Sequence, residues 1–324
     1  MSEQWGLRPR VLLSGAVDAE CERQISDVAE VVLAPDSHPD TLRKLIVDVD
    51  VLVVRSPLPS DLFDHAPRLK GVVRYGVGVD MIPMDAANAR RLPVANVPGS
   101  NRHAVSEHAM GALFLLRRRT MQMDALIRTK GWYKSRTLTE TAEELHGQVL
   151  GIVGVGEIGT RIAEIAHHGY GMRILGHQRR LETLPSFVTA SSLDDLLTQS
   201  DAVVLSCPLN ESTRGLISSH HIGLMPSHSI LINVARGEII DETALIAALR
   251  DRKIAGAALD VFRNQPLPTD HPLLAFDNAV LTPHAAGLTW QSMRLMGQGT
   301  AEAVRQILNN QLPQNIVNSE SLQK

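Results

Sequence analysis

The regular alternation of short apolar runs with helical segments constrains the fold of this chain more than any other feature. The apolar runs are rich in β-branched residues and read RVLLSG, EVVLA, VLVVR, GVVRY and PVANV, then VLGIV, MRILG, AVVLS, ILINV, AGAALDV and AVLTP. Helical segments fit between them, at residues 18–29, 39–47, 157–168, 193–199 and 241–251. Strands that alternate with helices in this way are typical of parallel sheets with crossover helices. We therefore predict an α/β fold with two Rossmann-like, doubly wound parallel-sheet domains.

The alternation is interrupted once, by a long helical stretch at residues 101–130. The length of 324 residues, 44% of them hydrophobic, fits about two domains that each bury a core. Apolar positions between Ala104 and Leu116 cover more than one face of this helix, so it is either buried in a core or shared with a second subunit. The basic run 117–119 is interpreted as its solvated end. A last helix at residues 291–310 closes the chain.

Charge and cysteine content exclude several classes of function. The formal net charge of −3 comes without a basic stripe, so we expect no nucleic-acid partner. The apolar runs are short and broken by charge, which predicts no membrane span and a cytoplasmic protein. Cys21 and Cys207 are far apart, and the histidine pairs at 167–168 and 220–221 have no cysteine nearby, so we expect no metal site.

A glycine-rich turn follows the strand VLGIV. Its pattern is GxGxxG, formed by Gly154, Gly156 and Gly159, with Glu157 and Ile158 between the last two, and an amphipathic helix follows. In this context the first glycine permits a tight turn, the second lets a pyrophosphate approach the backbone, and the third lets the helix pack on the strand. The phosphate charge then lies at the helix N-terminus, where amide groups are unpaired. The turn predicts a dinucleotide-binding site.

The next strand, MRIL, leads to the residues that select between the two nicotinamide cofactors. An NAD site carries an acidic residue about 20 positions past the glycines, but Gln178 stands there, followed by Arg179 and Arg180. Guanidinium groups hold a 2′-phosphate that a carboxylate would repel. We therefore predict a preference for NADP(H), with NAD(H) possible. The alternative is that both arginines are merely solvated.

An arginine and a histidine occur at the ends of two later strands. Arg236 follows ILINV, and His284 follows AVLTP. In a doubly wound sheet these strand ends face the ligand crevice. A 2-keto acid needs a cation for its carboxylate and a proton donor for its carbonyl, and this pair meets both needs. Each residue alone has a structural alternative, as an ion-pair partner or a loop histidine.

Long motifs along nearly the whole chain resemble those of the D-isomer-specific 2-hydroxyacid dehydrogenases, which include phosphoglycerate, lactate, glycerate and hydroxypyruvate/glyoxylate enzymes. The motifs, in order, are RYGVGVDMIP, VPGSNRHAVSEHAMG, ELHGQVLGIVGVGEIG, SCPLNESTRGLI, LINVARGEIIDETAL, ALDVF with QPLPTDHPLL, and LTPHAAG. The resemblance implies an oxidoreductase that moves a hydride between NADP(H) and a small 2-keto or 2-hydroxy acid.

The resemblance also implies an organisation and a set of site residues. Residues 1–98 plus 289–324 would form a substrate-binding domain, residues 99–288 the dinucleotide-binding domain, and the active site would lie in the cleft between them. A homodimer is implied, with the helix around 104–116 at its interface.

Arg236 matches the substrate-binding arginine and His284 the acid/base, while Val77 and Gly78 match the loop whose amides hold the substrate carboxylate. The positions that match cofactor contacts are Pro208, Thr213, Val234 and Asp260. Cys207 lies at the same strand end as Pro208, and we interpret it as a packing residue and not a nucleophile.

The chain departs from the family pattern beside the histidine. Gln265 stands where the family usually has a glutamate that orients the imidazole, and Asp260 is a possible substitute for the missing charge. Formate dehydrogenases, which are distant relatives, also resemble this arrangement. The alternatives to an active keto-acid reductase are thus a formate-dehydrogenase-like activity and a cofactor-binding sensor or corepressor on the same fold.

Overall fold

A computed structural model describes residues 8–322 and divides the chain into two compact units. The N-terminal unit comprises the chain up to Asn101 and the segment from Leu288 onward, and the central unit comprises Arg102–Gly287. Each unit is built on one parallel sheet, so the predicted fold of two parallel-sheet α/β domains is confirmed. No helix within residues 8–322 combines the length and the apolar character that a bilayer crossing requires.

The N-terminal unit is built on five parallel strands in the order β2-β1-β3-β4-β5. Their bounds are Arg10–Leu13 (β1), Glu30–Leu33 (β2), Val51–Val54 (β3), Gly71–Arg74 (β4) and Val94–Ala95 (β5). One face packs against α1 (Ala19–Ser26) and α11 (Trp290–Leu308), the other against α2 (Pro39–Leu45) and α3 (Met84–Ala89). The short helix α12 (Ser319–Leu322) follows α11. Successive side chains of buried strands such as β1 therefore enter alternate cores.

The central unit is built on seven parallel strands in the order β12-β11-β10-β9-β6-β7-β8. Their bounds are Val149–Val153 (β6), Arg173–His177 (β7), Val188–Ala190 (β8), Ala202–Leu205 (β9), Ile230–Asn233 (β10), Gly256–Leu259 (β11) and Ala279–Leu281 (β12). The strand order reverses between β6 and β9. In a sheet of this kind a ligand binds outside the carboxyl ends of the strands at that reversal.

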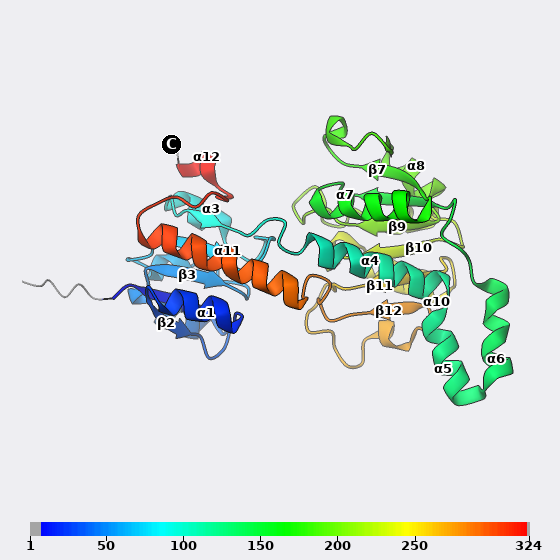
Figure 1. Ribbon diagram of the computed structural model, residues 1–324, viewed down its shortest axis with the longest axis horizontal. Coiled ribbons are helices and arrows are strands. Elements are labelled where there is room, and N and C mark those ends of the chain that lie inside the picture. Colours follow the sequence, from blue (N-terminus) through cyan, green and yellow to red (C-terminus); the bar gives the residue numbers. More distant parts are fainter. Residues whose placement is uncertain (1–7, 323–324) are drawn as a thin grey trace, which may run out of the picture. The chain divides into compact units, whose positions relative to one another are not determined.

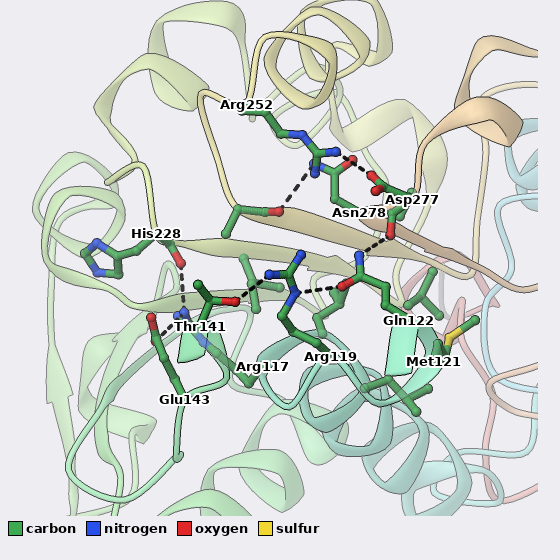
Figure 2. Close-up of a pocket in the computed structure, with 16 residues that line it drawn as sticks. Arg117, Arg119, Met121, Gln122, Thr141, Glu143, His228, Arg252, Asp277 and Asn278 are labelled. Carbon is green, nitrogen blue, oxygen red and sulfur yellow. Dashed lines mark hydrogen bonds and ion pairs between the residues drawn. The ribbon is translucent and has the colours of Figure 1, made fainter. Parts of the chain in front are cut away.

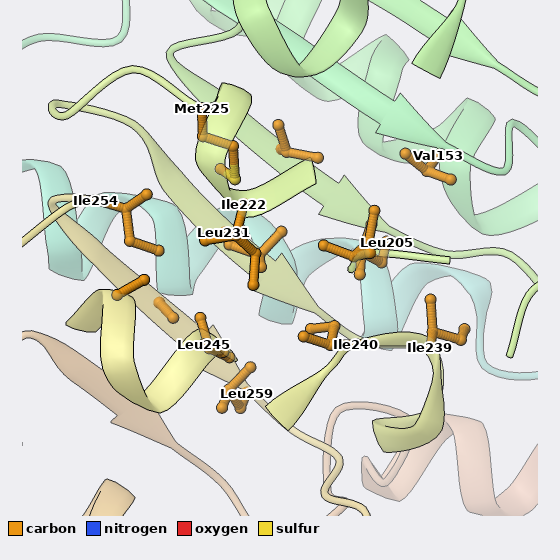
Figure 3. Packing of buried hydrophobic residues seen from close by; sticks show 14 of the residues in the cluster. Val153, Leu205, Ile222, Met225, Leu231, Ile239, Ile240, Leu245, Ile254 and Leu259 are labelled. Atoms are coloured by element: carbon orange, nitrogen blue, oxygen red, sulfur yellow. The ribbon is translucent and has the colours of Figure 1, made fainter. Parts of the chain in front are cut away.

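Helices cover both faces of this second sheet. The helices α4 (Arg102–Arg117) and α7 (Glu157–Glu164) lie side by side on one face (Figure 1). The other face packs against α8 (Leu193–Gln199), α9 (Ser219–Leu224) and α10 (Glu242–Arg250). Figure 3 shows this second core, where Leu205, Leu231 and Leu259 from three neighbouring strands meet Ile222 and Leu245 from the helices. The strands are thus covered on both sides, which explains their continuous apolar sequences.

The prediction of one continuous helix at residues 101–130 is wrong. The structure has two helices, α4 and α5 (Thr120–Lys130), and Arg119 between them has a φ of 53°, in the left-handed region. A third helix, α6 (Trp132–Arg136), turns back along α5, and the two form a hairpin that projects from the end of α4 (Figure 1). The helix α5 has no buried residue.

The interpretation of residues 117–119 as a solvated helix end is wrong for Arg117, which is only 4% exposed. Its Nη1 donates to Glu143 at 2.9 Å and to the carbonyl of His228 at 2.8 Å, and its Nη2 donates to the carbonyl of Asp201. Burial lowers the pKa of this guanidinium from its ordinary value. The long side chain turns inward because these acceptors lie next to the end of α4, which a sequence pattern does not reveal.

A pocket of about 250 Å³ lies at the root of the α5–α6 hairpin (Figure 2). Arg117 and Arg119 line it, together with Arg252, which pairs with Asp277. Ile230 and Ala279, the first residues of β10 and β12, also line it. The pocket therefore lies at the amino-terminal edge of the sheet, opposite the carboxyl ends that carry the predicted site residues of this unit.

Candidate active site

The three glycines after β6 occupy three different environments. Gly154 has a φ of 92°, and a Cβ on it would lie 2.6 Å from the backbone of Cys207. A Cβ on Gly159 would lie 2.2 Å from the carbonyl oxygen of Gly154. A Cβ on Gly156 would meet no atom within 4 Å, so open space lies beside this part of the turn. The first and third glycines permit close packing inside the protein, and the second leaves room for a ligand.

The helix α7 begins directly after this turn. Within the described chain no side chain caps its N-terminus, where Glu157 is exposed and Ile158 packs against the core. Amide groups at such a terminus and the positive end of the helix dipole favour an anion. The turn and the start of α7 therefore fit the pyrophosphate of a dinucleotide, which these residues would hold through backbone N–H groups.

Two exposed arginines follow β7, next to Gln178, whose side-chain amide makes hydrogen bonds within the loop. The Nε2 of Gln178 donates to the carbonyl of Arg180 at 2.7 Å and to the hydroxyl of Thr183 at 2.8 Å. Between residues 8 and 322, neither Arg179 nor Arg180 has a side-chain hydrogen bond or an ion pair, and both are exposed. Both guanidinium groups can thus turn toward a ligand without breaking an internal contact.

The segment after β9 approaches the glycine turn from the neighbouring strand. Cys207 is buried next to Gly154, and burial raises the pKa of its thiol to about 11. The hydroxyl of Thr213 donates to the carbonyl of Pro208 at 2.7 Å and accepts from the N–H of Asn210 at 2.8 Å, which closes this loop on itself. Val234 follows β10 and is half-buried.

Arg236 lies just beyond β10, and its backbone is held close to the next loop. The Nδ2 of Asn233 donates to the carbonyl of Arg236 at 2.8 Å, and the Nη1 of Arg236 donates to the carbonyl of Ala235 at 2.6 Å. A Cβ on Gly237 would lie 2.1 Å from the carbonyl carbon of Phe262. The arginine is therefore adjacent to the loop that carries Gln265.

His284 lies in a turn after β12, and Gln265 holds its ring. His284 has a φ of 54°, and its Nδ1 lies 2.9 Å from the Oε1 of Gln265. The Nε2 of Gln265 donates to the carbonyl of Phe262 at 3.2 Å, so its oxygen is the atom directed at the imidazole. A neutral imidazole that donates to this oxygen carries its hydrogen on Nδ1, so Nε2 is the nitrogen that can accept a proton. The carboxylate of Asp260 accepts from the N–H groups of Ala285 and Ala286.

Val77 and Gly78 lie in the N-terminal unit, after β4. The Nδ2 of Asn96 donates to the carbonyl of Val77 at 2.7 Å, and the Nε of Arg74 donates to the carbonyl of Gly78 at 3.0 Å. These two side chains shape the loop, and no motif in the sequence predicted either of them. The one available clue was that each is a polar residue at the carboxyl end of an apolar strand.

The two histidine pairs have structural contacts. His167 stacks on Phe187 with ring centroids 5.0 Å apart, and its Nδ1 lies 3.1 Å from the carbonyl of Met172. His221 completes a capping box with Ser218 at the start of α9. Both pairs belong to helix ends of the central unit.

Comparisons with known proteins identify the family of this chain. Residues 110–286 match the model of the D-isomer specific 2-hydroxyacid dehydrogenase, NAD binding domain. The chain is 36% identical over 325 residues to a glyoxylate reductase of Aeropyrum pernix, covering 97% of both chains. It is 34% identical to a D-3-phosphoglycerate dehydrogenase of Methanocaldococcus jannaschii, covering 97% of this chain and 60% of that one.

A solved structure shows the same relationship. The NADPH-dependent glyoxylate/hydroxypyruvate reductase of Sinorhizobium meliloti, in complex with NADP and malonate, superimposes with a TM-score of 0.87 at 27% identity, covering 97% of this chain and 98% of that one. The resemblance noted in the sequence is thus confirmed. The chain belongs to the D-isomer specific 2-hydroxyacid dehydrogenases, NAD(P)-binding oxidoreductases that act on the CH–OH group of their donors.

Proposed function

We propose that this protein reduces a small 2-keto acid, such as glyoxylate or hydroxypyruvate, with NADPH. The observation that carries the proposal is the convergence of the glycine turn, Arg236 and the Gln265–His284 pair at the carboxyl ends of strands in one sheet. The relatives named as glyoxylate and glyoxylate/hydroxypyruvate reductases support this substrate class.

The proposed roles follow from the chemistry of each group. NADPH, when bound at the glycine turn, supplies the hydride that reduces the keto carbon. Arg236 holds the substrate carboxylate and polarises the keto oxygen with its planar array of donors. His284 gives a proton from Nε2 to that oxygen as the hydride arrives. Val77 and Gly78 belong to the proposal as backbone donors to the substrate carboxylate.

The preference for NADPH rests on the end of β7. The two exposed guanidinium groups offer a 2′-phosphate two charged partners. Losing one such contact costs about 1.5–3 kcal/mol, or roughly 10- to 100-fold in affinity. Arg179→Ala should therefore raise KM for NADPH by at least tenfold and leave KM for NADH nearly unchanged. Arg173→Ala, at the other end of the same strand, is the matched control.

Turnover with a panel of 2-keto acids and both cofactors tests the proposed function. We expect oxidation of NADPH with glyoxylate or hydroxypyruvate, and no reduction of NADP⁺ by formate. If the protein binds NADPH but turns over no keto acid, the result would favour the alternative of a cofactor-binding sensor or corepressor. A wild type that prefers NADH by tenfold or more would contradict the cofactor assignment.

A further inference from the structure

A chain of hydrogen bonds joins helix α4 to the turn that carries His284. The Nε2 of His108, on α4, lies 3.2 Å from the Oγ1 of Thr282. The hydroxyl of Thr282 donates to the Oδ1 of Asp260 at 2.7 Å. The two oxygens of that carboxylate accept from the N–H groups of Ala285 and Ala286 at 2.8 and 2.9 Å. All five residues belong to the central unit.

The direction of each proton in this chain follows from the donors available. A threonine hydroxyl has one hydrogen, and Thr282 gives it to Asp260. The Nε2 of His108 must therefore carry a hydrogen and donate to the oxygen of Thr282. Asp260 is only 2% exposed, and a buried carboxylate is stable only when hydrogen-bond donors surround it. His108 thus fixes the hydroxyl of Thr282, and this hydroxyl fixes one oxygen of Asp260.

Asp260 determines the backbone of the turn around His284. The carbonyl of Asp260 accepts from the N–H of His284 at 2.8 Å, and its carboxylate holds the next two N–H groups. His284 has the left-handed φ of 54°, which is unfavourable for a residue with a side chain and needs such surrounding bonds to persist. Gln265 holds the ring from the other end. The direction of the imidazole therefore depends on the backbone bonds that Asp260 makes.

We propose that His108 and Thr282 are positioning residues that hold Asp260, and through it the turn of His284, in the conformation required for proton transfer. The proposal rests on the function proposed above for His284. It also means that the position of α4 and the conformation of this turn depend on each other. Neither residue touches the reacting atoms in this account, so each acts on the rate of the chemical step and only weakly on binding.

At each position, a pair of substitutions distinguishes the effect of the hydrogen bond from the effect of side-chain packing. Thr282→Val removes the hydroxyl and keeps the shape, whereas Thr282→Ser keeps the hydroxyl. His108→Leu removes the donor, whereas the amide of His108→Gln places a donor near the position of Nε2. We expect the valine and leucine variants to lose at least tenfold in kcat for keto-acid reduction. KM and the Kd for NADPH should change less than threefold, and the serine and glutamine variants should stay within threefold of the wild type.

The double variant and a remote control sharpen this test. If the residues act as one chain, His108→Leu combined with Thr282→Val is no slower than Thr282→Val alone. Thr198→Val, on the exposed face of α8, should keep the wild-type kcat. Independent, multiplying losses in the double variant would overturn the proposal, as would a valine variant that keeps more than half of kcat.

Hydrogen exchange at Ala285 and Ala286 gives a readout that needs no turnover. Both N–H groups should exchange at least fivefold faster in Thr282→Val and in His108→Leu than in the wild type. If Thr282→Val does not fold, His108→Leu and His108→Gln, at a half-exposed position, still test the proposal. Faster exchange in a protein that turns over no keto acid would refute the proposed function and leave the chain of bonds standing. Unchanged exchange in either loss variant would refute the chain itself.

Discussion

At the scale of single residues, the proposed function depends on the protonation of His284, whose ring contacts the neutral side chain of Gln265. The proposed keto-acid reduction needs the protonated imidazole, because in it His284 gives a proton as the hydride arrives. A carboxylate near the ring favours the charged form and raises its pKa, and an amide brings no such charge. Asp260, the alternative source of that charge, directs its carboxylate at the amides of Ala285 and Ala286, while Gln265 contacts the ring.

Gln265→Glu should therefore extend reduction to higher pH. The new carboxylate stabilises the imidazolium, so the pH above which kcat/KM for reduction falls should rise by about one unit, or on the order of 1.4 kcal/mol. The oxidative direction needs the neutral ring and should start at correspondingly higher pH. Profiles from about pH 5 to about pH 9, which bracket the ordinary histidine value, measure the shift. Asn264→Glu adds the same charge at the neighbouring exposed position as a control. If the profiles of the wild type and the Gln265→Glu variant superimpose, the role assigned to Gln265 is wrong.

Arg236→Lys keeps the charge and loses the planar pair of donors. We expect KM for the keto acid to rise and kcat to fall, with a combined loss of at least tenfold in kcat/KM. The Kd for NADPH should stay near the wild-type value. Steady-state kinetics on this variant and on Arg250→Lys, an exposed arginine at the end of α10, make the comparison. A lysine enzyme with the wild-type kcat/KM would remove Arg236 from the proposed mechanism.

Cys207 should be inert toward alkylating reagents in the folded protein. Burial raises the pKa of its thiol to about 11, so almost no thiolate forms at pH 8, and the residue is 8% exposed. Mass spectrometry after treatment with iodoacetamide should find this peptide unmodified until denaturant is added. Rapid modification of Cys207 in the native protein would show that the packing interpretation is incorrect.

At the scale of helices and strands, the sequence predicted those features that neighbouring residues determine. The β-branched runs predicted the strands of both sheets except the short strand β8, and the glycine turn after β6 has the geometry that its spacing indicates. The break at Arg119 was missed because no glycine or proline marks it. The acceptors that draw Arg117 inward, the carbonyls of Asp201 and His228, lie 84 and 111 residues away along the chain. A pattern of neighbouring residues cannot report such contacts.

The buried Arg117 should stabilise the junction of α4 with the sheet. Arg117→Met fills a similar volume and removes the bonds to two carbonyls and to Glu143. Hydrogen bonds from a charged, buried donor contribute about 1.5–3 kcal/mol each, so we expect a net loss of about 2–4 kcal/mol. For domains of this size that corresponds to a Tm lower by about 5 °C or more. Arg118→Met, at the exposed next position, controls for the loss of charge. Equal melting temperatures for the two variants would contradict this account of the junction.

At the scale of the whole molecule, the α5–α6 hairpin offers a different surface for the proposed homodimer than the helix at 104–116, whose residues Ala109, Met110, Ala112 and Leu113 are buried in the core of the central unit. Its exposed apolar side chains include Met121, Trp132 and Tyr133, which are 51%, 61% and 86% exposed, and α5 buries no residue within the chain. Several large apolar side chains on one projecting element are typical of a surface that a partner covers. We propose that a second copy of this chain covers them.

Trp132→Ser with Tyr133→Ser should therefore shift the protein from dimer to monomer. Sedimentation equilibrium should give twice the chain mass for the wild type and the mass of one chain for the double variant. Leu274→Ser, another exposed apolar position of the central unit, should remain dimeric. A double variant that stays dimeric, or a wild type that is monomeric, would contradict the proposal.

The most direct test of the central claim follows the hydride itself. The protein is incubated with hydroxypyruvate and NADPH that carries deuterium at C4 of the nicotinamide, on each face in turn, and the product is analysed by mass spectrometry and chiral chromatography. The account predicts that the label from one of the two faces appears at C2 of D-glycerate, and that His284→Phe abolishes this transfer. Label-free glycerate from both labelled cofactors, the L-isomer, or no reduced product from the wild-type enzyme would contradict it.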